Sequence, residues 1–336
     1  MRSDPNTARR GSLRLAFTLL VVSFLPGFAS SAAAQTTKAK KPTIPKPEML
    51  SFEGLGGVTI QYTYLAGGFI QKTDTEITTK PGKEVVPIIL LHGFEGRGAD
   101  LMPLALTLQR QGHAVVVPDL RGHGTSRYRV RGREDQPPAK LNRQDFNAMV
   151  GDVEVLKKFY YEKNNQGQVN VESLCLMGAD LGAAVATNWI ALDWSKPDLP
   201  AFRQGKSAKA LVVLSPVGSV KGYTANPAWK HEIFLTPARM SIMLVAGSRD
   251  GKSSSEARQI FNRIEKWHLT DPAAADKSRQ SLWLIEPDTD LTGGKLVDPR
   301  ARLSVTQLIV AFVKSRLADR QAEFPWSERR SPLDAQ

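Results

Sequence analysis

Leu174-Cys-Leu-Met-Gly-Ala-Asp-Leu-Gly-Ala-Ala-Val-Ala186 is the stretch that decides the fold of this chain. It begins as a continuous apolar run, which is typical of a buried β-strand. It then passes through Gly178-Ala-Asp-Leu-Gly182 into small residues that favour a helix. Such a tight turn needs glycine on both sides, because a side chain there would collide with neighbouring backbone. We therefore expect Asp180 at the tip of the turn, at a helix N-terminus, with its side chain in a cleft.

Apolar runs alternate with helical patterns on both sides of this stretch. The expected strands are Val58–Leu65, Val85–Leu91, His113–Asp119, Val169–Met177, Ala210–Ser215, Ile242–Ala246 and Leu282–Ile285. The expected helices are Ala99–Gln111, Arg143–Lys163, Leu181–Leu192, Ser254–His268 and Arg302–Ala318. This alternation predicts an α/β fold, with a mostly parallel central sheet and helices on both faces. Only Pro216–Ser241 separates two of the strands, so we expect a small lid or none.

The 336 residues fit one domain with short appendages. We expect a signal peptide over residues 1–34, a Lys- and Pro-rich linker over 35–50, the domain over 51–318 and a loose polar tail over 319–336. The formal net charge is +12, but no aromatic–basic pattern or nucleic-acid motif accompanies it. We therefore expect no nucleic-acid partner, and no cofactor. Cys175 is the only cysteine, so the chain forms no internal disulfide.

Three motifs follow three successive expected strands. His92-Gly93 follows the first, Asp119-Leu-Arg-Gly-His-Gly124 the second, and the turn at Asp180 the third. In this order they resemble the α/β-hydrolase superfamily, most closely its serine aminopeptidase and monoglyceride-lipase-like branch. The turn then corresponds to the nucleophile elbow G-x-S-x-G of that superfamily, with Gly178 and Gly182 as the elbow glycines.

The resemblance implies a triad in the chain order serine, acid, histidine. Asp180 stands where the serine belongs, and the resemblance places the oxyanion-hole amides at Phe94 and Leu181. Haloalkane dehalogenases and epoxide hydrolases use an aspartate at this position as the nucleophile. The alternative is a relic carboxylate that rests on the helix N-terminus. Asp250 stands at the acid position, where it would either orient a histidine or cap the helix that begins near Ser254.

The expected histidine is missing from Glu286–Leu296, and Thr292 is the best candidate for its place. His231 is a candidate for a displaced base, and a surface histidine without a role is the alternative reading. Asp180, Asp250 and either Asp288 or Asp290 could gather as oxygen ligands for a hard cation, although their spacing matches no metal motif. The remaining histidines, which we assign to structural positions, are His92, His113, His123 and His268.

Two hypotheses of function follow. In the first, the chain is an exported α/β-hydrolase-fold protein with a degenerate site that binds a small molecule without turning it over. In the second, it is an active hydrolase of ester, epoxide or haloalkane substrates that uses Asp180 with an unrecognised base. The ligand and the oligomeric state are not readable from the sequence.

The N-terminus carries the pattern of a secretory signal. Arg9, Arg10 and Arg14 precede the apolar run Leu15–Leu25, and small residues follow at Ser31–Gln35. The apolar run is shorter than the roughly 20 residues that span a bilayer. We predict that signal cleavage leaves Gln35 as the first residue of an exported chain, by ordinary or twin-arginine export. N-terminal sequencing of protein from the cell envelope or medium checks this, and recovery of only full-length cytosolic chain would contradict it.

Overall fold

The computed structural model describes residues 42–127, 135–199, 203–268 and 280–329. The expected signal peptide and residues 35–41 of the expected linker lie outside these residues. Within them, no helix has both the length and the apolar character needed to cross a membrane.

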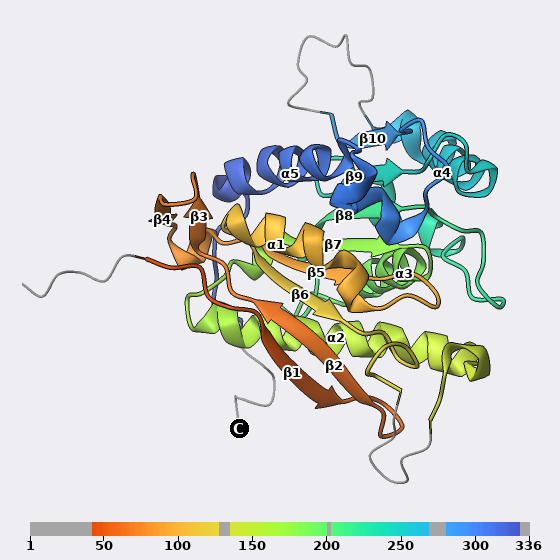
Figure 1. Ribbon diagram of the computed structural model, residues 1–336, viewed down its shortest axis with the longest axis horizontal. Coiled ribbons are helices and arrows are strands. Elements are labelled where there is room, and N and C mark those ends of the chain that lie inside the picture. The colour runs from red at the N-terminus through yellow and green to blue at the C-terminus, as the bar shows by residue number, and fades with distance from the viewer. Residues whose placement is uncertain (1–41, 128–134, 200–202, 269–279, 330–336) are drawn as a thin grey trace, which may run out of the picture. The chain divides into compact units, whose positions relative to one another are not determined.

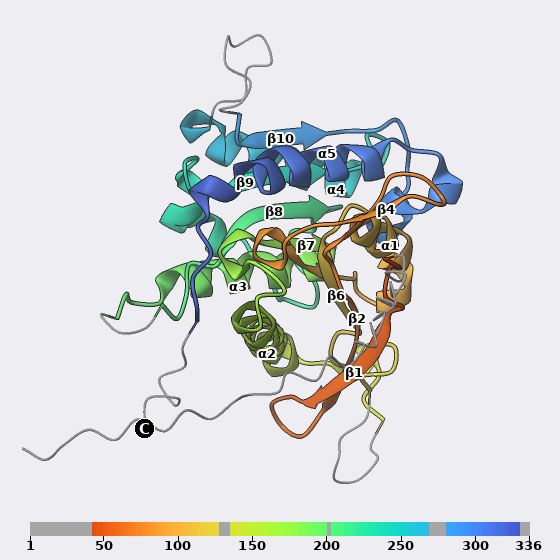
Figure 2. The same cartoon turned by 90° about the vertical axis from the view of Figure 1, so that its left-hand side faces the viewer.

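The core of the domain is an eight-stranded sheet in the order β1-β2-β6-β5-β7-β8-β9-β10 (Figures 1 and 2). β1 pairs with β2, and β2 with β6, in antiparallel fashion, whereas the remaining pairs are parallel. The strands are β1 Glu48–Glu53, β2 Thr59–Leu65, β5 Pro87–Leu91, β6 Ala114–Pro118, β7 Leu174–Ala179, β8 Ala208–Leu214, β9 Ser241–Val245 and β10 Leu282–Ile285. The mostly parallel sheet is the architecture that the sequence predicts.

Helices cover both faces of the sheet, and alternate strand residues point to opposite faces. In β7, Leu174 and Leu176 pack in one core with α2 Arg143–Asn165, α3 Leu181–Ser195 and α4 Gly251–Ile264. Cys175 and Met177 pack in the other core with α1 Met102–Arg110 and α5 Val305–Arg316. Because β7 is buried on both sides, its sequence is a continuous apolar run rather than an alternating one.

Three details differ from the sequence-based expectation. β1 begins at Glu48, inside the expected linker, and its mostly exposed residues carry no clear apolar alternation. A small hairpin of β3 Phe69–Gln71 and β4 Ile77–Thr79 is too short to have a recognisable period. β7 begins at Leu174 rather than Val169, because a 3₁₀ turn occupies Val171–Ser173.

The segment between β8 and β9 contains no α-helix of its own. It holds two 3₁₀ turns, Ala228–Lys230 and Glu232–Leu235. Trp229 and Phe234 are buried, with ring centroids 4.7 Å apart, and anchor the segment to the core. The expected absence of a large lid therefore agrees with the described structure.

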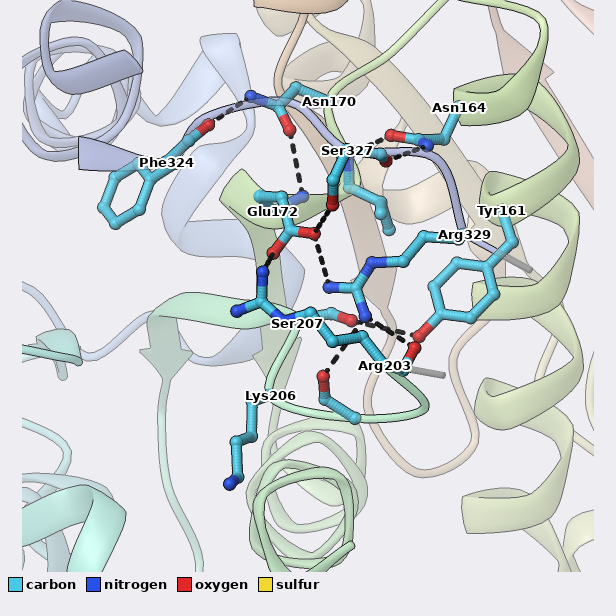
Figure 3. A network of polar contacts seen from close by, with 12 residues as sticks. Tyr161, Asn164, Asn170, Glu172, Arg203, Lys206, Ser207, Phe324, Ser327 and Arg329 are labelled. Atoms are coloured by element: carbon cyan, nitrogen blue, oxygen red, sulfur yellow. Dashed lines mark hydrogen bonds and ion pairs between the residues drawn. The ribbon is translucent and has the colours of Figure 1, made fainter. Parts of the chain in front are cut away.

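The C-terminal segment differs from the loose tail that its polar sequence suggests, as far as Arg329. A 3₁₀ helix spans Ala318–Glu323, and the following residues run back to the N-terminal end of β7. The Arg329 side chain is fully buried and lies 2.8 Å from the equally buried Glu172 carboxylate (Figure 3). Ser327 donates a hydrogen bond to the same carboxylate oxygen, and Arg203 pairs with the other one at 3.2 Å. A buried ion pair thus fixes this segment to the domain.

We predict that Arg329→Met lowers the free energy of unfolding by about 3 kcal/mol, because it removes one partner of a buried carboxylate. Arg203→Met is the matched control, since Arg203 contacts the same carboxylate from a side chain that is 53% exposed. This control should cost about 1 kcal/mol or less. Urea unfolding of both variants measures the difference, and equal losses would contradict the assigned role of Arg329.

Candidate functional site

A cavity of about 710 Å³ opens at the carboxyl ends of the central strands. Its walls include the loop after β5 at His92–Phe94, the elbow after β7 at Asp180 and the end of β8 at Ser215. Asp250 after β9 and Thr292 in the loop after β10 complete it. The sequence-predicted nucleophile position, acid position and vacant histidine position therefore line one cavity, as expected for loops at one edge of a parallel sheet.

The elbow at Asp180 has the predicted strained geometry. Asp180 has φ 47° and ψ −112°, and α3 begins at the next residue. A side chain on Gly178 would collide with the carbonyl oxygen of Gly182, and one on Gly182 with the carbonyl oxygen of Leu91. Both glycines are thus required by close backbone approach. A non-glycine residue at positive φ is held there only by its surroundings, and such strain is common at functional sites.

The Asp180 carboxylate lies on the amides that the sequence assigns to an oxyanion hole. The backbone N–H of Phe94 donates to Asp180 Oδ2 at 3.0 Å, and the Leu181 amide, where α3 begins, favours the charged carboxylate. Burial raises the pKa of Asp180 above its ordinary value, while the two amides act in the opposite direction. The side chain that replaces serine therefore occupies the anion-binding position itself.

Asp250 does not cap α4 with its side chain, although it stands at the N-cap position. Its Oδ2 instead accepts a hydrogen bond from the Ser253 hydroxyl, and the residue lines the cavity. Asp250 therefore does not cap α4 with its side chain, which was one of the two roles considered for it. Its position beside the cavity is the one that an acid of a triad would need.

No described histidine presents a free ring to Asp180. His92 lines the cavity, but its Nε2 accepts from the Leu120 amide at 2.9 Å, so its Nδ1 donates to the Gly93 carbonyl at 2.7 Å. Burial lowers the pKa of His92 to about 4. His123 lies behind it, and its Nδ1 hydrogen-bonds the Arg121 carbonyl. The His92 ring thus joins the loops that follow β5 and β6, and the His123 ring packs against it with centroids 5.1 Å apart.

The histidines outside these motifs are engaged elsewhere. His231 does not line the cavity; its Nδ1 accepts from the Ile233 amide, and its Nε2 lies 3.0 Å from the Ser195 hydroxyl. The hypothesis that His231 is a displaced base at this site is therefore wrong. His268 is buried between Ser281 and the Phe234 carbonyl, and burial lowers its pKa rather than favouring a cation. His113 is also buried, and burial lowers its pKa to about 3.

The carboxylates considered as metal ligands do not gather. Asp288 is exposed and pairs with Arg249 at 3.3 Å, and neither Asp288 nor Asp290 lines the cavity. Among the residues that the structure describes, no group of three or more His, Cys, Asp or Glu side chains could hold a metal ion. The carboxylate-cluster hypothesis is wrong, because Asp288 turns outward to an arginine.

Ser215 is a site residue that the sequence analysis missed. It follows β8 directly, beside Asp180, whose amide donates to the Leu214 carbonyl. It also has a positive φ of 47°, and its hydroxyl accepts the Gly293 amide at 2.8 Å. Ser215 thereby fixes the loop that carries Thr292 to the cavity wall. Its place at the carboxyl end of a parallel strand was the available signal.

The family model for serine aminopeptidase, S33, matches residues 83–275, which is more than half of the chain. The chain belongs to this family. The match includes Asp119–Gly124, the elbow and Asp250, so the resemblance drawn from the motifs is confirmed. Membership establishes the α/β-hydrolase fold of this S33 chain. It does not establish a complete catalytic triad, for which only the geometry of Asp180, Asp250 and Thr292 gives evidence.

Solved structures give the same fold. The carboxyl esterase of Bacillus coagulans matches with a TM-score of 0.55 and 12% identity, over 81% of this chain and 99% of the esterase. The dienelactone hydrolase of Anabaena variabilis matches at 0.53 and 14%, over 82% and 100% of the two chains. The acylaminoacyl peptidase of Pyrococcus horikoshii matches at 0.53 and 12%, over 87% of this chain and 44% of the peptidase. At such identities the similarity concerns the fold alone. A search of curated proteins found no match.

Proposed function

We propose that this chain is an exported α/β-hydrolase-fold protein that binds a small molecule in the Asp180 cavity without turning over acyl esters. The observation that carries the proposal is the hydrogen bond from the Phe94 amide to Asp180 Oδ2. Acyl transfer needs the oxyanion-hole amides free, because they stabilise the negative oxygen of the tetrahedral intermediate. A carboxylate already bound to the Phe94 amide excludes the substrate carbonyl from that position.

The absence of a free imidazole supports the same proposal. Ester hydrolysis by a serine-type site needs a base to activate the nucleophile and later the water. The cavity contains His92 alone among the described histidines, and both of its ring nitrogens already have backbone partners. Losing both the hydroxyl nucleophile and the base removes several powers of ten in rate.

The second candidate is an active hydrolase with Asp180 as nucleophile, and one observation favours it. Asp180 stands at the tip of the elbow in the cavity, and its carboxylate forms no ion pair with any described residue. Such a carboxylate can attack an alkyl carbon, so that a new C–O ester bond forms while the bond to a halide or epoxide oxygen breaks. Without an activated water the ester persists. This candidate therefore also requires a base that the described residues do not show, and the binding proposal predicts at most one stoichiometric adduct.

We predict that the wild-type chain does not hydrolyse p-nitrophenyl acetate above the buffer rate, and that Asp180→Ser alone gains little. Adding Thr292→His to Asp180→Ser should give detectable hydrolysis, because Thr292 and Asp250 line the same cavity. The matched control adds Asp250→Asn to the double variant and should remove most of the gain. Initial rates, and mass spectrometry of the protein after exposure to an epoxide and a haloalkane, provide the measurements.

Robust ester turnover by the wild-type chain that disappears in Asp180→Asn would overturn the binding proposal. Repeated turnover of an epoxide or haloalkane, with Asp180 required, would instead establish the second candidate. A single mass adduct on Asp180 without product accumulation agrees with the absence of an effective base.

A further inference from the structure

The charged side chains that line the Asp180 cavity differ in the ion-pair and hydrogen-bond partners that they have within the chain. Four acids and four cations line it: Asp100, Asp180, Asp250, Asp298, Arg97, Lys252, Lys295 and Arg300. Two pairs are internal. Arg97 lies 3.7 Å from Asp100, and Arg300 lies 2.7 Å from Asp298. These four groups neutralise each other at the rim.

The other two acids are already hydrogen-bonded within the chain. Asp180 accepts from the Phe94 amide, and Asp250 accepts from the Ser253 hydroxyl. These donors are neutral, and their direction holds the two carboxylates on the backbone and on Ser253 rather than on the two remaining cations. Neither carboxylate forms an ion pair with a lysine in the part of the chain that the structure describes.

Lys252 and Lys295 are the two cavity cations that remain. Neither side chain makes a hydrogen bond, an ion pair or a ring contact with any residue in the described ranges, and both are exposed. Lys252 comes from the first turn of α4, two residues after Asp250, and Lys295 comes from the loop that contains Thr292. The loops at the acid position and at the vacant histidine position therefore each contribute one ammonium group to the same cavity.

We propose that the occupant of this cavity is a small organic molecule with a carboxylate or phosphate group, bound by Lys252 and Lys295. The inference rests on the proposed binding function and adds the chemical class of the ligand. Each ammonium group has three donors and no acceptor, so an anionic oxygen is the partner that it lacks. The Phe94 amide is occupied by Asp180, so the ligand anion binds at the lysines instead.

The size of the cavity requires more than a free anion. A volume of about 710 Å³ is in the range of small-molecule sites. Phe94, Leu101 and Val217 supply apolar wall beside the charged groups. The anionic group is therefore one end of a larger molecule, whose apolar part lies against these side chains.

Calorimetric titration of the wild-type chain at low ionic strength tests the proposal with hexanoate, hexyl phosphate and the uncharged hexanamide. We expect one or both anions to bind roughly threefold to tenfold more tightly than hexanamide, as two solvent-accessible ion pairs allow. The preferred anion distinguishes carboxylate from phosphate. Lys252→Met with Lys295→Met should reduce the affinity for the anion to that for hexanamide. Lys230→Met, an exposed lysine outside the cavity, is the matched control and should change nothing.

Equal affinity for hexanamide and both anions, no binding of either anion, or an anion preference that survives the double lysine variant would each overturn the inference. These outcomes are separable from the proposed function, because ester turnover is measured independently. Wild-type turnover would remove the binding role while leaving an anion preference intact. A missing anion preference would remove the ligand class while leaving the inactive elbow intact.

Discussion

The hydrogen bond from the Phe94 amide to the Asp180 carboxylate is the contact on which the candidate site depends. It joins the loop after β5 to the elbow after β7, two neighbouring strands in the middle of the sheet. The elbow aims the side chain of Asp180 at this amide because Gly178 and Gly182 permit the close turn. With serine, the same geometry would leave the amides for a substrate oxygen; with aspartate, the chain supplies the anion itself.

The surroundings of this contact retain much of a hydrolase scaffold. Asp250 still lines the cavity without capping its helix, and Ser215 holds the loop where the histidine would stand. The catalytic groups are what differ, since Thr292 offers no base and no described histidine presents a free ring to Asp180. Lys252 and Lys295 are the cavity cations that have no ion-pair partner among the described residues. A binding role is thus compatible with S33 family membership, because a fold does not by itself determine an activity.

Much of this organisation was predictable from local sequence patterns. The apolar run at Leu174 and the two glycines predicted a buried strand and a tight turn, because both depend on short-range sterics. The failures depend on contacts distant in sequence. The polar segment that ends at Arg329 is fixed by Glu172, and His231 is tied to Ser195 rather than to the cavity. Ser215 was missed because its role requires knowing which strand lies beside β7.

The most direct test of the account is whether the amides of the elbow are occupied in the wild-type chain. Amide NMR shifts of Phe94 and Leu181, followed during titration with formate, report this for the wild type and for Asp180→Ala. The account predicts no saturable change at these amides in the wild type, and a saturable change in the variant, where formate replaces the lost carboxylate. A saturable response of both amides in the wild-type chain would contradict it.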